Sequence, residues 1–127
     1  MRVSIQHNQK SSGWIFKQPY IEVATSVAFS EEELAIIRSK KLQKFVLLER
    51  GPDFIVCKRF ENDQAYLNSL SGFEMSVAKL MKGTDTFNCE TAVHAKNYEA
   101  QVTEALKTLK EFIVGNAQVA QSKSFEL

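Results

Sequence analysis

The stretch YIEVATSVAFSEEEL, residues 20–34, contains the end of one predicted element and the start of the next. Up to Phe29 the apolar and polar side chains alternate, which is the period of a strand with one buried face. Ser30 and Glu33 then have the spacing of a capping box, in which each side chain accepts a hydrogen bond from the other residue's backbone amide. Phe29 and Leu34 have the spacing of a hydrophobic staple across the same boundary. A strand that passes directly into a helix predicts a mixed α+β domain.

Similar patterns predict the elements on either side of this boundary. We expect strands over residues 2–7, 20–29, 44–48, 54–60, 73–81 and 87–93. Helices are expected over residues 31–39 and from Asn97 to Gly115, where apolar side chains recur every three or four positions. Because short turns join successive strands, the sheet should be mostly antiparallel, with about six strands in the order β-β-α-β-β-β-β-α. The apolar stripe of the second helix then covers one face of that sheet in a two-layer domain.

Length and composition are those of one globular domain. The chain has 127 residues, of which 44% are apolar and 24% are charged, close to the average for folded proteins. We assign residues 1–116 to a single domain and residues 117–127, which have no strong period, to a flexible tail. Sixteen basic and fifteen acidic residues give a net charge of +1, so no overall charge attracts nucleic acid.

Membrane segments, leader peptides and metal sites are not predicted. No stretch approaches the roughly 20 apolar residues of a spanning helix, and residues 2–13 lack the apolar core of a signal peptide. We therefore expect a cytoplasmic protein without a membrane partner. Cys57 and Cys89 lie far apart and have no CxxC spacing, so neither a disulfide framework nor a zinc site is indicated, and no cofactor is expected.

The strongest candidate for a binding surface is the aromatic segment just before the alternating strand. It comprises Trp14, Ile15, Phe16 and Tyr20. Tryptophan and tyrosine supply large amphipathic area at interfaces, so we expect this segment to dock a protein partner. The competing interpretation is that Trp14 is a core residue that seals the end of the sheet. A free sheet edge is the other expected interface, and either surface would support a homodimer.

A basic cluster after the first helix is a second candidate binding surface. Its members are Arg38, Lys40, Lys41, Lys44, Lys58 and Arg59. Phosphate groups bind such clusters, and nearby phenylalanine rings could stack on bases. We favour the simpler interpretation that residues 38–41 complement the negative end of the helix, because the balanced charge of the chain gives nucleic-acid binding no support.

Nucleophilic catalysis would need a thiol or hydroxyl close to a base. The ionisable candidates are Cys57, Cys89, His7 and His94. If Cys89 and His94 share one strand, they lie on opposite faces and about 17 Å apart, which is too far for a catalytic pair. No motif in the chain is specific enough to indicate a family. The sequence therefore favours a small non-enzymatic binding or assembly protein that self-associates. A polyanion binder and a Cys/His enzyme assembled from distant segments are the alternatives.

Overall fold

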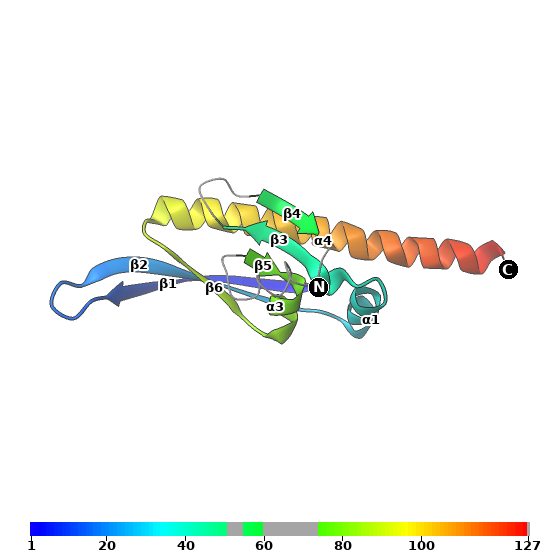
Figure 1. The fold of residues 1–127 in the computed structure, drawn as a ribbon, viewed down its shortest axis with the longest axis horizontal. Helices are drawn as coiled ribbons and strands as arrows, with labels where there is room; N and C mark the ends of the chain where they lie inside the picture. The colour runs from blue at the N-terminus through cyan, green and yellow to red at the C-terminus, as the bar shows by residue number, and fades with distance from the viewer. Residues whose placement is uncertain (51–54, 60–73, 127) are drawn as a thin grey trace.

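The computed structural model describes residues 1–50, 55–59 and 74–126, with side chains over residues 1–50 and 74–115. Figure 1 shows the elements along the chain. They are β1 (Arg2–Ser12), β2 (Gln18–Ala28), α1 (Glu31–Ser39), the 3-10 turn η1 (Leu42–Lys44), β3 (Phe45–Glu49), β4 (Ile55–Arg59), β5 (Glu74–Ser76), α3 (Val77–Lys82), β6 (Asp85–Cys89) and α4 (Ala92–Glu126). The polar stretch over residues 61–72, for which the sequence allows a loop or one irregular helical turn, lies outside the described residues.

The described strands form two antiparallel sheets of three strands each, in the orders β1-β2-β6 and β4-β3-β5. The α+β class, the antiparallel pairing and the long C-terminal helix are therefore confirmed. The prediction of a single sheet of about six strands is wrong. Between β2 and β3 the chain passes through α1 and η1, with Lys41 in the left-handed region at φ 55°. The chain changes direction through this segment, and β3 then begins a second sheet instead of pairing with a strand of the first.

The hairpin of β1 and β2 projects well beyond the body of the molecule, at the left of Figure 1. Its pairing runs from Arg2 opposite Ala28 to Ser12 opposite Gln18. The first strand, expected to end at residue 7, therefore continues to Ser12. Residues 8–12 are mostly exposed polar residues, so no alternation of polarity marks them as a strand in the sequence.

Helix α1 begins as the sequence predicts. The Ser30 hydroxyl accepts a hydrogen bond from the Glu33 amide at 3.1 Å, and the Glu33 carboxylate accepts one from the Ser30 amide at 2.8 Å. These two bonds satisfy amides that have no partner inside a helix. The capping box is confirmed, and Ile37 anchors the helix in the core.

The predicted strand over residues 73–81 is wrong. Only β5 is extended, and α3 follows it at once, which inserts a helix into the expected run of four strands. The Ser76 hydroxyl accepts a hydrogen bond from the Lys79 amide at 3.2 Å and so caps α3. Val77 and Leu80 are both buried, and their spacing of three residues places them on one face of a helix. The apolar residues of this segment are equally compatible with a strand, so the sequence alone does not distinguish the two.

Helix α4 is longer at both ends than expected. It starts at Ala92, where the Thr91 hydroxyl accepts a hydrogen bond from the His94 amide at 3.0 Å. Val93, assigned to a strand from the sequence, therefore lies in the first turn of the helix. At the other end α4 continues to Glu126, past the termination predicted at Gly115. The flexibility of residues 117–127 stays a prediction.

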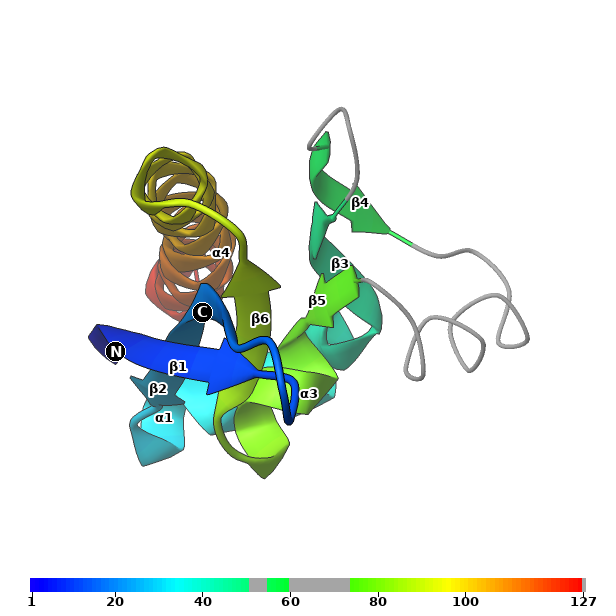
Figure 2. The same ribbon diagram turned by 90° about the vertical axis from the view of Figure 1, so that its left-hand side faces the viewer.

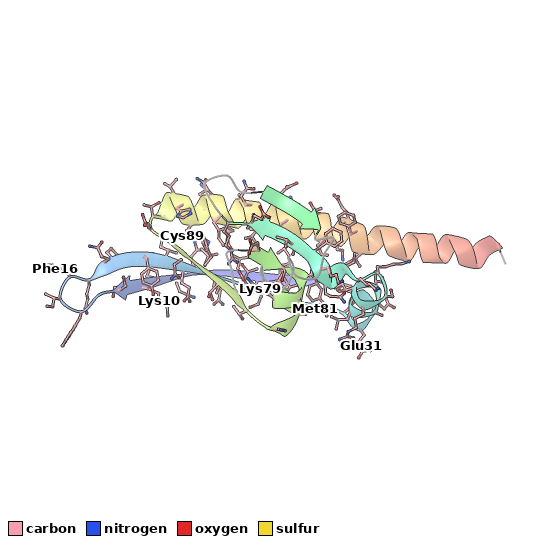
Figure 3. The ribbon with its side chains drawn as sticks, in the orientation of Figure 1. Lys10, Phe16, Glu31, Lys79, Met81 and Cys89 are labelled. Carbon is pink, nitrogen blue, oxygen red and sulfur yellow. The ribbon has the colours of Figure 1, made fainter. Side chains whose placement is uncertain are left out.

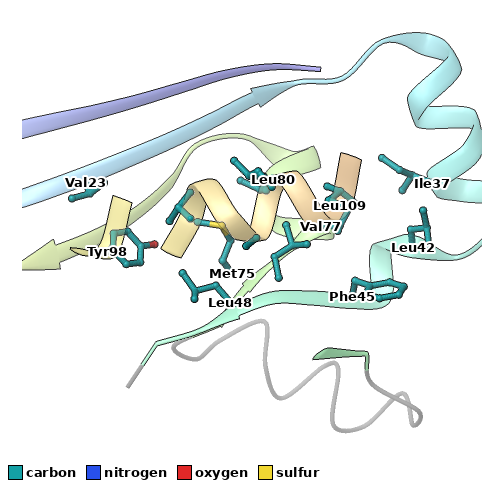
Figure 4. Close-up of a cluster of buried hydrophobic side chains, with 14 of the residues drawn as sticks. Val23, Ile37, Leu42, Phe45, Leu48, Met75, Val77, Leu80, Tyr98 and Leu109 are labelled. Atoms are coloured by element: carbon teal, nitrogen blue, oxygen red, sulfur yellow. The ribbon is translucent and has the colours of Figure 1, made fainter. Parts of the chain in front are cut away.

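The core lies where α4 packs against strands of both sheets (Figure 2). The predicted stripe is confirmed, with these buried members: Val102, Ala105, Leu106, Leu109 and Ile113. Figure 4 shows Tyr98 and Leu109 in one cluster with Val23 of β2 and Leu48 of β3. Phe112, on the margin of the stripe, packs on Phe45 with 5.0 Å between ring centroids. One helix thus serves as the shared core element of two sheets.

Candidate functional site

The turn between β1 and β2 carries a cluster of exposed apolar side chains. We call residues 13–17 the hairpin tip. Trp14 is 95% exposed, and Ile15 and Phe16 are each 82% exposed. Figure 3 shows Phe16 at the end of the hairpin, away from the rest of the molecule. Trp14 therefore does not seal the end of a sheet, because its side chain lies almost wholly in solvent.

The backbone of the hairpin tip depends on Gly13. This residue has φ +96°, a backbone conformation that residues other than glycine rarely adopt. A Cβ atom at this position would also clash with the carbonyl oxygen of Phe16. The turn is consequently tight, and the three apolar residues that follow Gly13 lie within it. The pairing of residues 8–12 with residues 18–22 places these three consecutive residues at the end of the hairpin.

Charged side chains lie on either side of the three apolar residues of the hairpin tip. Residues 11–16 carry no ionisable side chain, whereas Lys10 and Lys17 lie on either side. Tyr20, the fourth predicted interface residue, is opposite Lys10 in the strand pairing and is partly buried. It lines a separate hollow of about 700 Å³ with Pro19, Asn88 and other residues. The structure thus groups Trp14, Ile15 and Phe16 but places Tyr20 outside their cluster.

A buried polar cluster that the sequence did not indicate connects the sheets to α4. Arg50, directly after β3, donates a hydrogen bond from Nε to the Tyr98 hydroxyl at 3.0 Å and forms an ion pair with Asp85 of β6. The Arg50 guanidinium also lies over the Phe87 ring, 5.1 Å from its centroid. Because the side chains of Arg50 and Asp85 are each only 6% exposed, the pair is held away from water.

Burial governs the ionisation of this cluster. It raises the pKa of Asp85, although the Arg50 charge opposes the change. Burial likewise raises the pKa of Tyr98, and burial together with the nearby Arg50 charge lowers the pKa of Lys79. A cleft of about 520 Å³ opens beside the pair, with Lys79 and Lys82 on its wall. The cluster has the features of a structural tie between β3, β6 and α4.

The basic cluster is only partly described. Arg38, Lys40 and Lys41 are exposed at the end of α1, and Lys44 is partly buried. The side chains of Lys58 and Arg59 lie outside the described residues. The pairing of β4 with β3 places Arg59 opposite Phe45, next to Lys44 in the chain. The backbone therefore brings the two halves of the cluster to one end of the second sheet.

The described thiol and imidazole groups occupy different surroundings. Cys89 is completely buried, and burial raises the pKa of its thiol, which disfavours the reactive thiolate. The His7 imidazole lies 3.2 Å from a Glu99 carboxylate oxygen, whereas the His94 ring packs edge-on against Phe87. The side chain of Cys57 lies outside the described residues. Among the residues that are described, no three His, Cys, Asp or Glu side chains gather as metal ligands.

Comparison of the chain with protein-family models, with curated proteins and with solved structures gave no match. In the described part of the chain no helix has both the length and the apolar character needed to cross a membrane. Among the side chains that the structure describes, those of Trp14, Ile15 and Phe16 in the hairpin tip are the most exposed large apolar ones.

Proposed function

We propose that this protein is a non-enzymatic assembly protein that associates with a second copy of itself through the hairpin tip. The observation that carries the proposal is the exposure of three consecutive apolar side chains, Trp14, Ile15 and Phe16, at the end of a projecting hairpin. Single exposed apolar residues are common on protein surfaces, but a contiguous exposed apolar patch is typical of an interaction site. Tryptophan is also among the residues that contribute most to binding energy at interfaces.

The shape of the molecule supports contact between two tips. Because the hairpin projects from the body, two tips can meet without a collision between the bodies (Figure 1). The uncharged stretch over residues 11–16 leaves no ionisable group to be desolvated at the contact. Lys10 and Lys17 then lie at the rim, where long side chains keep their charges in water.

The small area of the tip favours a weak, reversible dimer. Large apolar side chains bury about 150–250 Å² each, so two tips would bury on the order of 1,000 Å² in total. That is below the size of most stable interfaces and within the range of transient ones. We therefore expect a reversible dimer with a dissociation constant in the micromolar range, or roughly −8 kcal/mol at the 1 M standard state.

Molar mass by sedimentation equilibrium tests this proposal. Wild-type protein should shift from monomer to dimer as concentration rises through the micromolar range, and Trp14→Ala should stay monomeric. Val93→Ala is the matched control, because Val93 is also apolar and 70% exposed but lies at the start of α4. An unchanged dimer in Trp14→Ala would contradict the proposal. So would a monomeric wild type whose tip binds anionic lipid vesicles.

Polyanion binding is the second candidate function. It is supported by the strand pairing that brings the backbone of Lys58 and Arg59 to the end of the second sheet that also holds Lys44. Salt separates the two functions. Binding of a fluorescent single-stranded oligonucleotide would weaken steeply as salt rises, because each phosphate contact releases a counterion. A dimer through the hairpin tip should instead become slightly tighter, since salt screens the repulsion between its rim lysines.

A further inference from the structure

The outer edge of β1 is unpaired in the described part of the chain. Within the part of the chain that the structure describes, β1 pairs with β2 alone, although it is eleven residues long. An edge of this length presents a row of N–H and C=O groups that can form a full ladder with another extended chain. Such an edge selects the conformation of its ligand, because only an extended backbone can pair with it.

An apolar groove runs beside this edge, between β1 and α4. It has a volume of about 300 Å³ and is lined by Met1, Val3, Thr103, Leu106, Lys107 and Lys110. Val3 is 41% exposed, so α4 leaves this part of the inner face of β1 partly open. The contact between His7 and Glu99 joins the strand to the helix farther along. A strand added to β1 would direct every second side chain toward α4 and into the groove.

The charges around the groove are basic. The sequence of β1 includes Arg2, His7 and Lys10 and no acidic residue. On the helix side, Lys107 and Lys110 line the groove, and Lys110 also lies 3.6 Å from the Glu33 carboxylate. Because side chains alternate along β1, Arg2 and Lys10 lie on the face opposite Val3 and the groove. A ligand strand with carboxylates would therefore meet basic side chains on both of its faces.

The same charges oppose the pairing of β1 with a second copy of itself. If two β1 strands paired in antiparallel fashion about Gln6, Arg2 of each copy would lie opposite Lys10 of the other. Like charges directly opposite each other destabilise a strand pair. The edge therefore favours an acidic segment over another β1.

We propose that the free edge of β1 and the adjacent groove bind an extended, acidic segment of another protein by β-strand addition. Backbone hydrogen bonds to β1 supply affinity, apolar side chains of the segment fill the groove, and its carboxylates pair with Lys107 and Lys110. This surface is separate from the hairpin tip, so the inference is independent of the proposed function.

Capped peptides of about seven residues, roughly 23 Å when extended, are suitable probes. In one peptide the side chains at every second position are alternately valine and glutamate, with threonine between them, so that both types face α4. In the other peptide lysine replaces glutamate. The glutamate peptide should bind with a dissociation constant below about 1 mM and slow amide hydrogen exchange on β1, whereas the lysine peptide should do neither. Failure of the glutamate peptide to bind, equal binding of both peptides, or protection elsewhere would overturn the proposal. Protection of β1 that increases with protein concentration in the absence of peptide would identify a second copy as the occupant instead.

Charge reversal locates the site on α4. Lys107→Glu should weaken binding of the glutamate peptide about tenfold, since it replaces attraction by repulsion in the groove. Lys96→Glu is the matched control, with the same change in net charge about 16 Å away along the helix, beyond the range of salt-screened interactions. Equal losses in the two variants would contradict the site. Trp14→Ala should bind the peptide as the wild type does, so the tip and the groove are tested separately.

Discussion

Arg50 and Asp85 form a buried ion pair that joins the end of β3 to the start of β6, so it connects the two sheets of the molecule. The hydrogen bond from Arg50 to Tyr98 extends the same connection to α4. Removal of one partner from a buried ion pair costs more free energy of unfolding than the intact pair contributes, because the other charge stays buried without a partner. The polar cluster therefore connects the two sheets and α4, as the apolar core also does.

We predict that Asp85→Ala lowers the free energy of unfolding by about 3–5 kcal/mol. The loss follows from the desolvated Arg50 guanidinium, which would lose the Asp85 carboxylate beside it. Urea denaturation measures the change. Thr86→Ala, at the next, exposed position of the same strand, should stay within about 0.5 kcal/mol of wild type. If both variants unfold at the same urea concentration, the ion pair contributes nothing to stability.

The Tyr98 hydroxyl should resist ionisation as long as the protein is folded. Burial raises its pKa above the ordinary value of 10.0, although Arg50 opposes this. A raised pKa in the folded state means that the stabilisation is complete below about pH 10 and is lost as the pH rises above it. An alkaline titration followed by tyrosinate absorbance measures this. Tyr98 should ionise only at the pH where the protein unfolds, as measured by far-ultraviolet circular dichroism. Tyr98→Phe should lack that coincident step, and its persistence in the variant would contradict the assignment.

Glu33 makes stability depend on acid. Its burial raises its pKa, but hydrogen bonds from the Met1 amino group and from Ser30 outweigh this effect and lower the pKa from 4.5 to about 2. A lowered pKa in the folded state stabilises the protein above about pH 4.5, and this contribution is lost as the pH falls toward 2. Glu33→Gln should therefore cost about 2 kcal/mol at pH 7 and progressively less below pH 4.5 in urea denaturation. Glu32→Gln, on the exposed side of α1, should show no such trend.

Ser76 distinguishes the start of a helix from the middle of a strand. As the N-cap of α3 it should tolerate glycine better than alanine, because Ser→Ala at a cap costs about 1 kcal/mol and Ser→Gly only a few tenths. In the middle of a strand, glycine would be the worse replacement. Thermal unfolding of Ser76→Ala and Ser76→Gly decides between the two. A lower melting temperature for the glycine variant would contradict the observed helix start.

The sequence predictions are accurate where an element is determined by residues close together in the chain, and inaccurate where it depends on distant contacts. The start of α1 was predictable because its capping box and staple lie within six consecutive residues, from Phe29 to Leu34. The segment over residues 73–81 was not, because its alternation fits a strand while Val77 and Leu80 also fit a helix. Burial against η1, β2 and β3 accompanies the short helix, and local sequence does not reveal these contacts.

The candidate site was predictable in composition but not in geometry. Trp14, Ile15 and Phe16 are adjacent in the chain, so their cluster could be recognised from the sequence. Their exposure depends on the pairing of polar strand residues that carry no apolar pattern, and this pairing extends the hairpin beyond the core. Arg50 and Asp85 are 35 positions apart and share no motif, so only the fold brings them together.

The fluorescence of Trp14 tests the central claim most directly, because it is the single tryptophan of the chain and lies in the proposed contact. Emission spectra and sedimentation equilibrium should be recorded on the same samples across the micromolar range. If the hairpin tips form the dimer, the emission maximum shifts to shorter wavelength in proportion to the dimer fraction, as Trp14 leaves water. A dimer that forms while the emission of Trp14 remains that of a fully exposed indole would contradict the account.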